Sequence, residues 1–393
     1  MISRHYPLPD LDQAQRLLEQ IFSGVPAFPP EDHDTEVILY GAGNLGRMAC
    51  EFLDYVGVNI LHAYDQAAKD GDTLGGSVPV YQPSEPGVHG NHLILVTTLS
   101  VPYTEIERFL ISLGWKRILP FYDYALQYSD IHPLNNGWFS GPLSHEDREM
   151  IQDSLLLFTD YQSYAAYLQF LAWRVLREDW IFDDVSVTKA DRFFIEPICN
   201  VLTDNEIFLD VGSYHGDVFF RFLELSKGKF LSAVLIEPDR TNITTLRKKV
   251  SSLPDAMRKK ITIIHKCVGT SSGSVKFGHS FGYASRIWDI SNECAEVVTI
   301  DGLFIPFSFM KMHIEGGEMD ALSRGKDLLV SSRPIIAITI YHNRDGLWKL
   351  MHFLKDLLEE YLFFVRMHSW CGTGIIIYGI PKEIRRDFID FNY

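Results

Sequence analysis

The chain has 393 residues, 46% of them hydrophobic and 22% charged, which is enough for two ordinary globular domains. Its formal net charge of −15 repels phosphate backbones and therefore argues against a nucleic-acid partner. Five dispersed cysteines, the lack of a signal-peptide pattern and the lack of a membrane-length apolar run predict a cytoplasmic protein with free thiols and no membrane span.

Residues 1–34 form a predicted lead-in, with one helix expected over 11–22. From Glu36 the pattern changes to strand, glycine turn, helix and strand, and a further strand and helix follow from His92. Strands that alternate with helices in this way indicate a parallel sheet covered by helices. We therefore expect a Rossmann-like, doubly wound α/β domain over 35–125.

A glycine-rich turn in this first domain has the spacing of a dinucleotide-binding fingerprint. GAGNLG, with Gly41, Gly43, Asn44 and Gly46, stands between a predicted strand and a predicted helix. Asp65 ends the next strand, where a carboxylate can bind ribose hydroxyls. The domain resembles small nucleotide-binding modules of bacterial sugar-modifying enzymes, which implies a nucleotide or nucleotide-sugar ligand. A glycine turn without a ligand stays open as an alternative.

A helical connector is predicted over 126–194, followed by a second α/β domain over 195–393. The strands of the second domain are expected at 206–212, 233–238, 261–268, 309–316, 334–341, 361–368 and 374–381. The last two are separated only by the segment SWCGT, which is short enough for a hairpin. We therefore expect a doubly wound sheet that is parallel except for an antiparallel last strand.

The segment DVGSYHGD follows the first strand of the second domain and leads into a helix. Gly212 and Gly216 allow its backbone to turn sharply and to approach a ligand closely. Asp210 ends the strand, and Glu237 ends the next strand 21 residues after Gly216. Carboxylates at these places suit the ammonium and hydroxyl groups of a nucleoside ligand.

Four segments of the second domain resemble, in chain order, the FkbM family of methyltransferases. They are DVGSYHGD, IEPD (236–239), VTIDGL (298–303) and KMHIEGGEMDAL (311–322). The resemblance implies a class I methyltransferase fold that uses S-adenosylmethionine, and an acceptor hydroxyl on a sugar, a nucleotide-sugar or a small metabolite. It also implies that the donor is bound by Asp210, Gly212, Ser213, Gly216, Asp217, Glu237 and Ser271.

One position departs from the family, because His313 stands where the family usually has aspartate. Methyl transfer to a hydroxyl needs a base for the acceptor's proton, and histidine can serve at neutral pH. We predict His313, Glu315 and His342 as the catalytic residues, since His342 follows the next strand at the same edge of the sheet. The pair of ligands in HIE makes no metal site, so no metal is predicted.

Two other functions stay open at this point. A methyltransferase fold without catalysis would act as a nucleotide-binding or regulatory protein, and the replacement at His313 favours this alternative. An NAD(P)-dependent oxidoreductase would use GAGNLG, but its Tyr-x-x-x-Lys candidate, Tyr378 and Lys382, contains Pro381 and cannot share a helix face. The sequence does not identify the acceptor, and it is compatible with a homo-oligomer.

Overall fold

The computed structural model describes residues 1–85, 87, 90–132, 134, 138–278, 285–287 and 291–385. Residues 386–393, which the predicted second domain includes, lie outside this range. The chain divides into two compact units, neither of which is continuous in sequence. Unit 1 comprises Met1–Ser144, Ala165–Thr188 and Met367–Gly374, and unit 2 comprises His145–Tyr164, Lys189–Arg366 and Ile375–Tyr393. The predicted connector 126–194 is thus divided between the two units.

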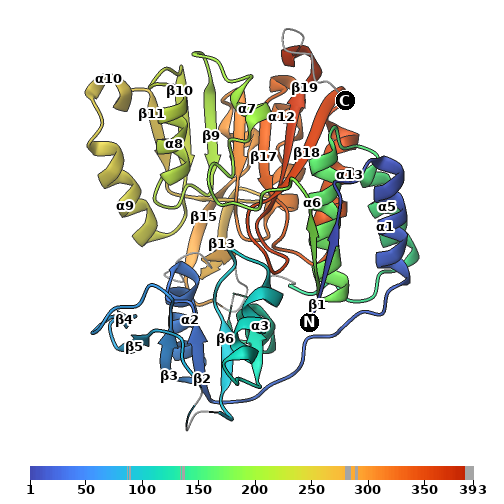
Figure 1. Ribbon diagram of the computed structural model, residues 1–393. Coiled ribbons are helices and arrows are strands. Elements are labelled where there is room, and N and C mark those ends of the chain that lie inside the picture. The colour runs from blue at the N-terminus through green and yellow to red at the C-terminus, as the bar shows by residue number, and fades with distance from the viewer. Residues whose placement is uncertain are drawn as a thin grey trace. The chain divides into compact units, whose positions relative to one another are not determined.

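Unit 1 is built on a six-stranded sheet with the order β4-β5-β3-β2-β6-β7 (Figure 1). Its strands are β2 (Glu36–Tyr40), β3 (Asn59–Tyr64), β4 (Thr73–Leu74), β5 (Val78–Tyr81), β6 (Leu93–Val96) and β7 (Ile118–Pro120). Neighbouring strands are parallel except for β4 and β5. Helix α2 (Asn44–Tyr55) leads from β2 to β3, and α3 (Tyr103–Ser112) leads from β6 to β7 in the opposite direction across the sheet. Right-handed crossovers place these helices on opposite faces, as a doubly wound sheet requires.

Two predicted helical or irregular segments contain strands instead. β1 (Ile2–Tyr6) lies in the predicted lead-in and pairs in parallel with β8 (Glu178–Phe182), at the end of the predicted long helix. The helical stretch ends at Arg177, whose backbone is left-handed with φ 58°. The pairing joins segments that are far apart in the chain, so local patterns do not reveal it. The remaining helical elements of this region are α1 (Leu11–Ser23), α4 (Phe121–Ala125), η2 (Leu126–Tyr128), α5 (His145–Leu155), α6 (Tyr161–Leu171) and η3 (Ala172–Leu176).

Unit 2 contains a seven-stranded sheet with the order β11-β10-β9-β16-β17-β19-β18. The strands are β9 (Ile207–Val211), β10 (Ser232–Ile236), β11 (Ile261–Ile264), β16 (Phe309–Met312), β17 (Ile335–Thr339), β18 (Tyr361–Met367) and β19 (Ile375–Pro381). From β11 to β17 all neighbours are parallel, and β19 runs antiparallel to β17. The expected antiparallel last strand is therefore confirmed, and it lies between β17 and β18.

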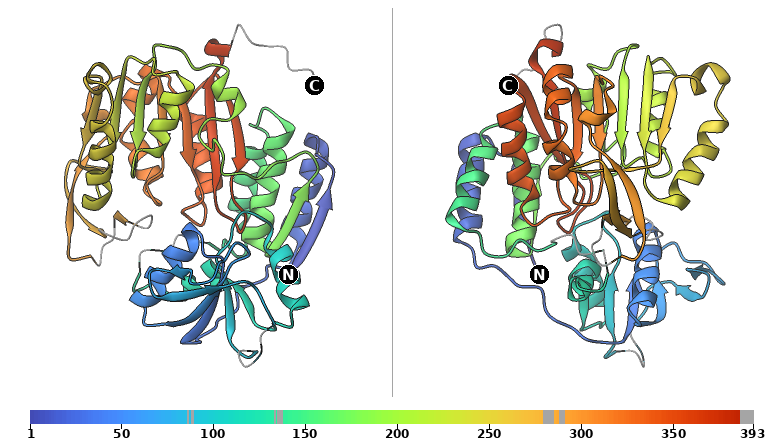
Figure 2. Two further views of the ribbon diagram at one scale, coloured as in Figure 1. Left: turned by 60° about the vertical axis from the view of Figure 1, so that its left-hand side comes forward. Right: turned by 180° about the vertical axis from the view of Figure 1, so that it is seen from behind.

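The helices of unit 2 cover both faces of this sheet. From β9 the chain crosses through α8 to β10, towards one edge of the sheet. From β16 it crosses to β17, and then through α13 to β18, towards the opposite edge. With right-handed crossovers the two groups of helices lie on opposite faces, and Figure 2 shows the second group, in orange and red, from behind. The helices are α7 (Glu196–Cys199), α8 (Asp217–Leu225), α9 (Arg240–Ser251), α10 (Asp255–Arg258), α11 (Glu318–Ser323), α12 (Lys326–Ser332), α13 (Gly346–Leu357) and the 3-10 turns η5 (Asp301–Leu303) and η6 (Lys382–Arg385).

Aromatic packing joins the central strands to the first helix of this unit. The Phe208 and Phe222 rings stack with centroids 4.6 Å apart, and Phe309 from the neighbouring strand meets Phe208 edge-on. All three side chains are fully buried. Burial of each such side chain stabilises the fold by roughly 1.5–3 kcal/mol, so this core fixes the spacing of β9, β16 and α8.

A second, smaller sheet of unit 2 corrects one strand prediction. The segment 261–268 was expected as a single strand. Instead, β11 ends at Ile264, and β12 (Cys267–Val268) belongs to the smaller sheet, where it pairs with β15. The polar pair His265 and Lys266 separates the two strands. The small sheet has the order β12-β15-β13-β14, with β13 (Gly273–Gly278), β14 (Arg286–Ile287) and β15 (Cys294–Val298). None of the described helices is long and apolar enough to cross a membrane.

Candidate functional site

A cavity of about 300 Å³ lies in unit 2 at the carboxyl ends of β9, β10 and β16. This is where the strand order reverses, because β9 leads towards β10 while its other neighbour β16 leads towards β17. Open α/β sheets bind ligands at such a reversal. The small sheet adds Cys267, Val268 and Phe277 to the lining, so the cavity has polar groups at the strand ends and apolar groups beside them.

The loop after β9 needs glycine for reasons of space and of backbone angle. Gly212 has φ 78°, and a Cβ there would lie 1.9 Å from the carbonyl oxygen of His313. Gly216 has φ 83°, and a Cβ there would lie 2.7 Å from Leu246. The Gly212 N–H donates to the carbonyl of Ile236 over 3.0 Å. The loop is therefore held between β10 and the end of β16.

Glu237 follows β10, lines the cavity and is tied to the glycine loop. Its carboxylate accepts the backbone N–H of Tyr214 over 2.7 Å and that of Asp239 over 2.9 Å. Burial raises the pKa of Glu237 to about 7, although both N–H groups favour the charged form. The structure thus brings this residue to the loop, as the spacing predicts.

Asp210 occupies a different place from the one that the sequence indicates. It is fully buried and does not line the cavity, and its Oδ1 accepts a bond from Lys311 Nζ over 2.9 Å. Lys311 stands opposite Asp210 on β16, lines the cavity and also donates to the carbonyl of Gly212 over 2.6 Å. A buried ammonium needs a counter-charge, which explains the pairing. Sequence reasoning missed Lys311, although a lone lysine in the apolar strand FMKM was a usable signal.

The other predicted donor residues divide into two groups. Ser213 and Asp217 line the cavity, whereas Gly216 directly precedes α8 and is not part of the lining. Ser271 is exposed in the turn before β13 and lies outside the lining. Its displacement follows from the break between β11 and β12, which brings Cys267 rather than Ser271 to the cavity wall.

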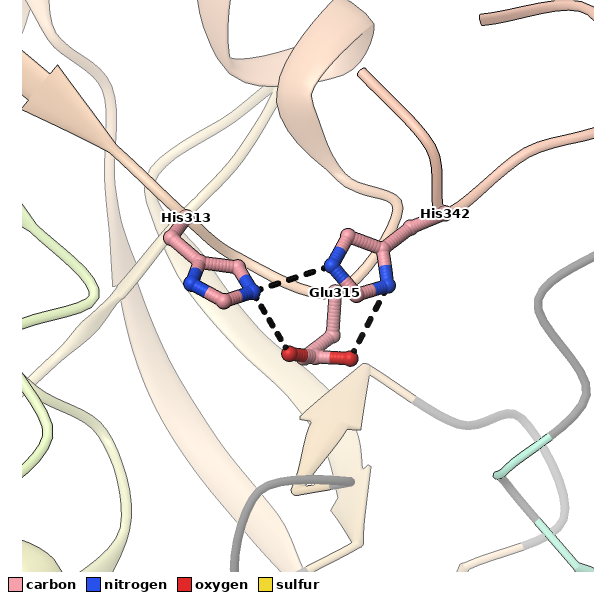
Figure 3. A group of neighbouring side chains, drawn as sticks. All are labelled: His313, Glu315 and His342. Carbon is pink, nitrogen blue, oxygen red and sulfur yellow. Dashed lines mark hydrogen bonds and ion pairs between the residues drawn. The ribbon is translucent and has the colours of Figure 1, made fainter. Parts of the chain in front are cut away.

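The three predicted catalytic residues form one cluster, shown in Figure 3. His313 directly follows β16 and His342 follows the adjacent strand β17, so both lie at one edge of the sheet. The Nε2 atoms of the two histidines are 2.9 Å apart. Glu315 places Oε1 3.0 Å from His313 Nε2 and Oε2 3.1 Å from His342 Nδ1. His313 and Glu315 line the cavity.

The backbone around the cluster is held by a buried carboxylate. Glu315 has a left-handed backbone with φ 56°, which is uncommon for a residue with a side chain. The carboxylate of Glu318 accepts the two backbone N–H groups that flank Glu315, from Ile314 over 3.1 Å and from Gly316 over 3.0 Å. Thr339 donates its hydroxyl to the same carboxylate over 3.0 Å. The surrounding structure therefore fixes the conformation of Glu315.

The charge state of the cluster is set by burial and by nearby cations. Burial, together with the positive charges of Arg192 and Lys311, lowers the pKa of His313 well below its usual value. Both effects favour the neutral form of the His313 imidazole. Arg192 also lines the cavity, and the sequence offered no motif that would have identified it.

In unit 1 the glycine loop is held by the carboxylate of Asp65, which follows β3. Asp65 accepts the N–H of Ala42 over 2.8 Å and that of Ala67 over 2.9 Å. A Cβ on Gly46 would lie 2.2 Å from the carbonyl oxygen of Gly41, so close packing of α2 on the loop explains this glycine. A Cβ on Gly43 would meet nothing within 4 Å. Asn44, the other predicted residue here, begins α2.

Comparison with known proteins identifies the part of the chain that holds the cavity. Residues 210–365 match the family model of the methyltransferase FkbM domain. These residues form an FkbM methyltransferase domain. The FkbM domain contains the glycine loop, Glu237 and the cluster of His313, Glu315 and His342, so the family resemblance seen in the sequence is confirmed.

One solved structure agrees with this at the level of the fold. The chain is similar to methyltransferase FkbM from Methylobacillus flagellatus KT, with a TM-score of 0.61, 17% identity, and 94% of this chain and 98% of that chain covered. A more distant similarity is to SMU.1697c from Streptococcus mutans, solved in complex with S-adenosylhomocysteine, with a TM-score of 0.29, 12% identity, and 46% of this chain and 90% of that chain covered. A search of curated protein sequences gave no significant match.

Proposed function

We propose that the chain transfers a methyl group from S-adenosylmethionine to a hydroxyl of a sugar, a nucleotide-sugar or another small metabolite. The observation that carries this proposal is a single cavity with two kinds of wall. One wall has the Gly212 loop and Glu237, and the other has His313 and Glu315. A donor and an acceptor bound at these walls would meet inside one cavity, which supports methyl transfer within the FkbM domain.

The residues of the first wall fit the proposed donor. Glu237 offers a carboxylate for the two ribose hydroxyls, and Val268 and Phe277 offer apolar surface for an adenine ring. Lys311 adds a positive charge for the carboxylate of the methionine part, and Asp210 acts by holding Lys311 in place. S-adenosylmethionine would supply an activated methyl group there.

The residues of the second wall suit the acceptor. A hydroxyl must lose its proton as its oxygen becomes methylated, and a positioned base accelerates such a step by ~10²–10⁴. We assign removal of this proton to the cluster of His313, Glu315 and His342. The larger part of the acceleration comes from holding the hydroxyl oxygen in line with the methyl group.

Calorimetry on the full-length protein tests the proposal. S-adenosylhomocysteine should bind at one site per chain, and labelled S-adenosylmethionine should transfer its methyl group to at least one member of a panel of sugars and nucleotide-sugars. No binding of S-adenosylhomocysteine would refute the donor site. Binding without transfer to any hydroxyl would favour a domain without catalysis that acts in nucleotide binding or regulation.

Nucleotide binding by unit 1 is a second proposal, and it rests on the loop 41–46. Gly43 precedes α2 without a side-chain cap, and the space around its Cα is open, which suits a phosphate at the helix N-terminus. Titration of the full-length protein with UDP-sugars and with NAD tests it. Heat from UDP-sugars that disappears in Gly43→Asp would support the proposal, and no heat from either ligand would refute it.

A further inference from the structure

The cluster in the second wall has the composition of a metal site. Two imidazoles and one carboxylate each offer a ligand atom, and these atoms lie within 4.8 Å of one another. As metal ligands, the sequence alone suggested only the pair His313 and Glu315. His342 becomes the third member because β16 and β17 are adjacent parallel strands whose ends meet at one edge of the sheet.

Two of the three spacings between the ligand atoms are close to what a tetrahedral ion requires, and all three lie within 4.8 Å. Zn²⁺ bonds of about 2.0–2.1 Å imply ligand atoms roughly 3.3–3.4 Å apart. His313 Nε2 lies 2.9 Å from His342 Nε2 and 3.0 Å from Glu315 Oε1. These two distances need to widen by only a few tenths of an ångström, which small side-chain rotations allow. Glu315, whose Oε2 lies 3.1 Å from His342 Nδ1, must also turn so that its carboxylate and His342 Nε2 reach the same ion. The Tyr341 hydroxyl also lies 3.4 Å from His313 Nε2.

The surroundings of the cluster hold it in place and leave one side open. Glu318 fixes the backbone on both sides of Glu315, and Asn343 donates its amide to the carbonyl of Gly316 over 3.0 Å. The loops after β16 and β17 are thereby joined. His313 and Glu315 line the cavity while His342 is buried behind them, so an ion held by all three would face the cavity.

We infer that His313, Glu315 and His342 bind one divalent first-row transition metal ion, with its remaining coordination positions directed into the cavity. Two imidazole ligands favour Zn²⁺ and similar ions over Mg²⁺, which prefers oxygen ligands. Three protein ligands with an open position are typical of catalytic rather than structural zinc.

A metal ion in this place would change how the acceptor loses its proton. The ion would bind the acceptor hydroxyl and lower the pKa of that hydroxyl, and the proton would then leave to water instead of to a histidine. This role rests on the proposed methyl transfer, whereas metal binding itself does not.

Equilibrium dialysis of the full-length protein against Zn²⁺, followed by elemental analysis, tests the inference. We expect about one tightly bound Zn²⁺ per chain, and a loss of affinity of ~100-fold or more in both His342→Ala and Glu315→Gln. Glu315→Gln keeps the shape of the side chain, so it serves if His342→Ala does not fold. Mg²⁺ should not compete with Zn²⁺.

The matched control is His145→Ala, which removes an exposed histidine that also lies near a carboxylate, 3.5 Å from Glu149. It should retain the full zinc content. The inference fails if the wild-type protein binds no Zn²⁺, if Glu315→Gln binds as much as wild type, or if Mg²⁺ displaces Zn²⁺. S-adenosylhomocysteine binding, measured on the same samples, separates this result from the fate of the donor site.

Discussion

The two glycine loops of this chain are similar in sequence pattern and differ in what their glycines do. Each loop follows a parallel strand, precedes a helix and has a carboxylate at the end of the next strand, Asp65 in unit 1 and Glu237 in unit 2. Both carboxylates accept a backbone N–H from their loop, from Ala42 and from Tyr214 respectively. The shared pattern therefore explains how each loop is held in place, whether or not the loop binds a ligand.

The difference lies in what approaches the glycine. Gly46 is required because the helix packs on the carbonyl of Gly41 within the same loop. Gly212 is required because the carbonyl of His313, the residue after β16, occupies the space of its missing side chain. The first loop is thus a local structure, and the second is part of a contact between distant segments that also forms a cavity wall. The same motif can therefore require glycine for a contact within its own loop or for a contact with a distant segment of the chain.

The strongest test of this difference is Gly212→Ala against Gly43→Ala. Alanine at 212 would place Cβ 1.9 Å from the His313 carbonyl oxygen at φ 78°, so we expect a loss of about 3–5 kcal/mol in the stability of unit 2 and loss of S-adenosylhomocysteine binding. Alanine at 43 meets nothing within 4 Å and should change stability by no more than about 0.5 kcal/mol. Thermal unfolding and calorimetry measure both effects, and equal effects would contradict the comparison.

A smaller effect is expected from Glu237→Gln against Asp65→Asn. Hydrogen bonds to a charged group contribute roughly 1.5–3 kcal/mol, so Glu237→Gln should weaken S-adenosylhomocysteine binding by about 10–100-fold. Asp65→Asn makes the same chemical change in the other loop and should leave this affinity unchanged. Calorimetry under one set of conditions compares them. If Asp65→Asn also weakened binding, the donor could not be assigned to the Glu237 loop alone.

The last test is a pH dependence of stability in the donor-free protein, an effect that is spread over several pH units. Burial raises the pKa of Glu237 from the usual 4.5 to about 7, so the folded state holds this proton more tightly than the unfolded state. The resulting stabilisation is complete below pH 4.5 and is lost as pH rises through 7. Wild type should therefore lose about 2–3 kcal/mol relative to Glu237→Gln between pH 5 and 8. Melting temperatures across this range measure the difference, and parallel pH profiles would exclude a raised pKa.

Local patterns predicted most of the sheet strands, the antiparallel β19 and the place of Glu237, because each depends on hydrophobic alternation or on spacing within one strand-loop-helix unit. They did not predict the pair of Asp210 and Lys311, which lie 101 residues apart and meet only because β9 and β16 are neighbours. The same reason hides the pairing of β1 with β8. Ser271 was misplaced because a two-residue polar break redirects the chain between two sheets.

The contact between Gly212 and His313 also has a thermodynamic consequence. A ligand that orders the glycine loop restricts the same backbone segment that positions His313, and a ligand that fixes His313 restricts the loop. Such a coupling is reciprocal, so any factor by which a ligand at the cluster changes donor affinity is also the factor by which the donor changes affinity at the cluster. The contact between Gly212 and the His313 carbonyl is the place in the structure through which such a coupling would pass.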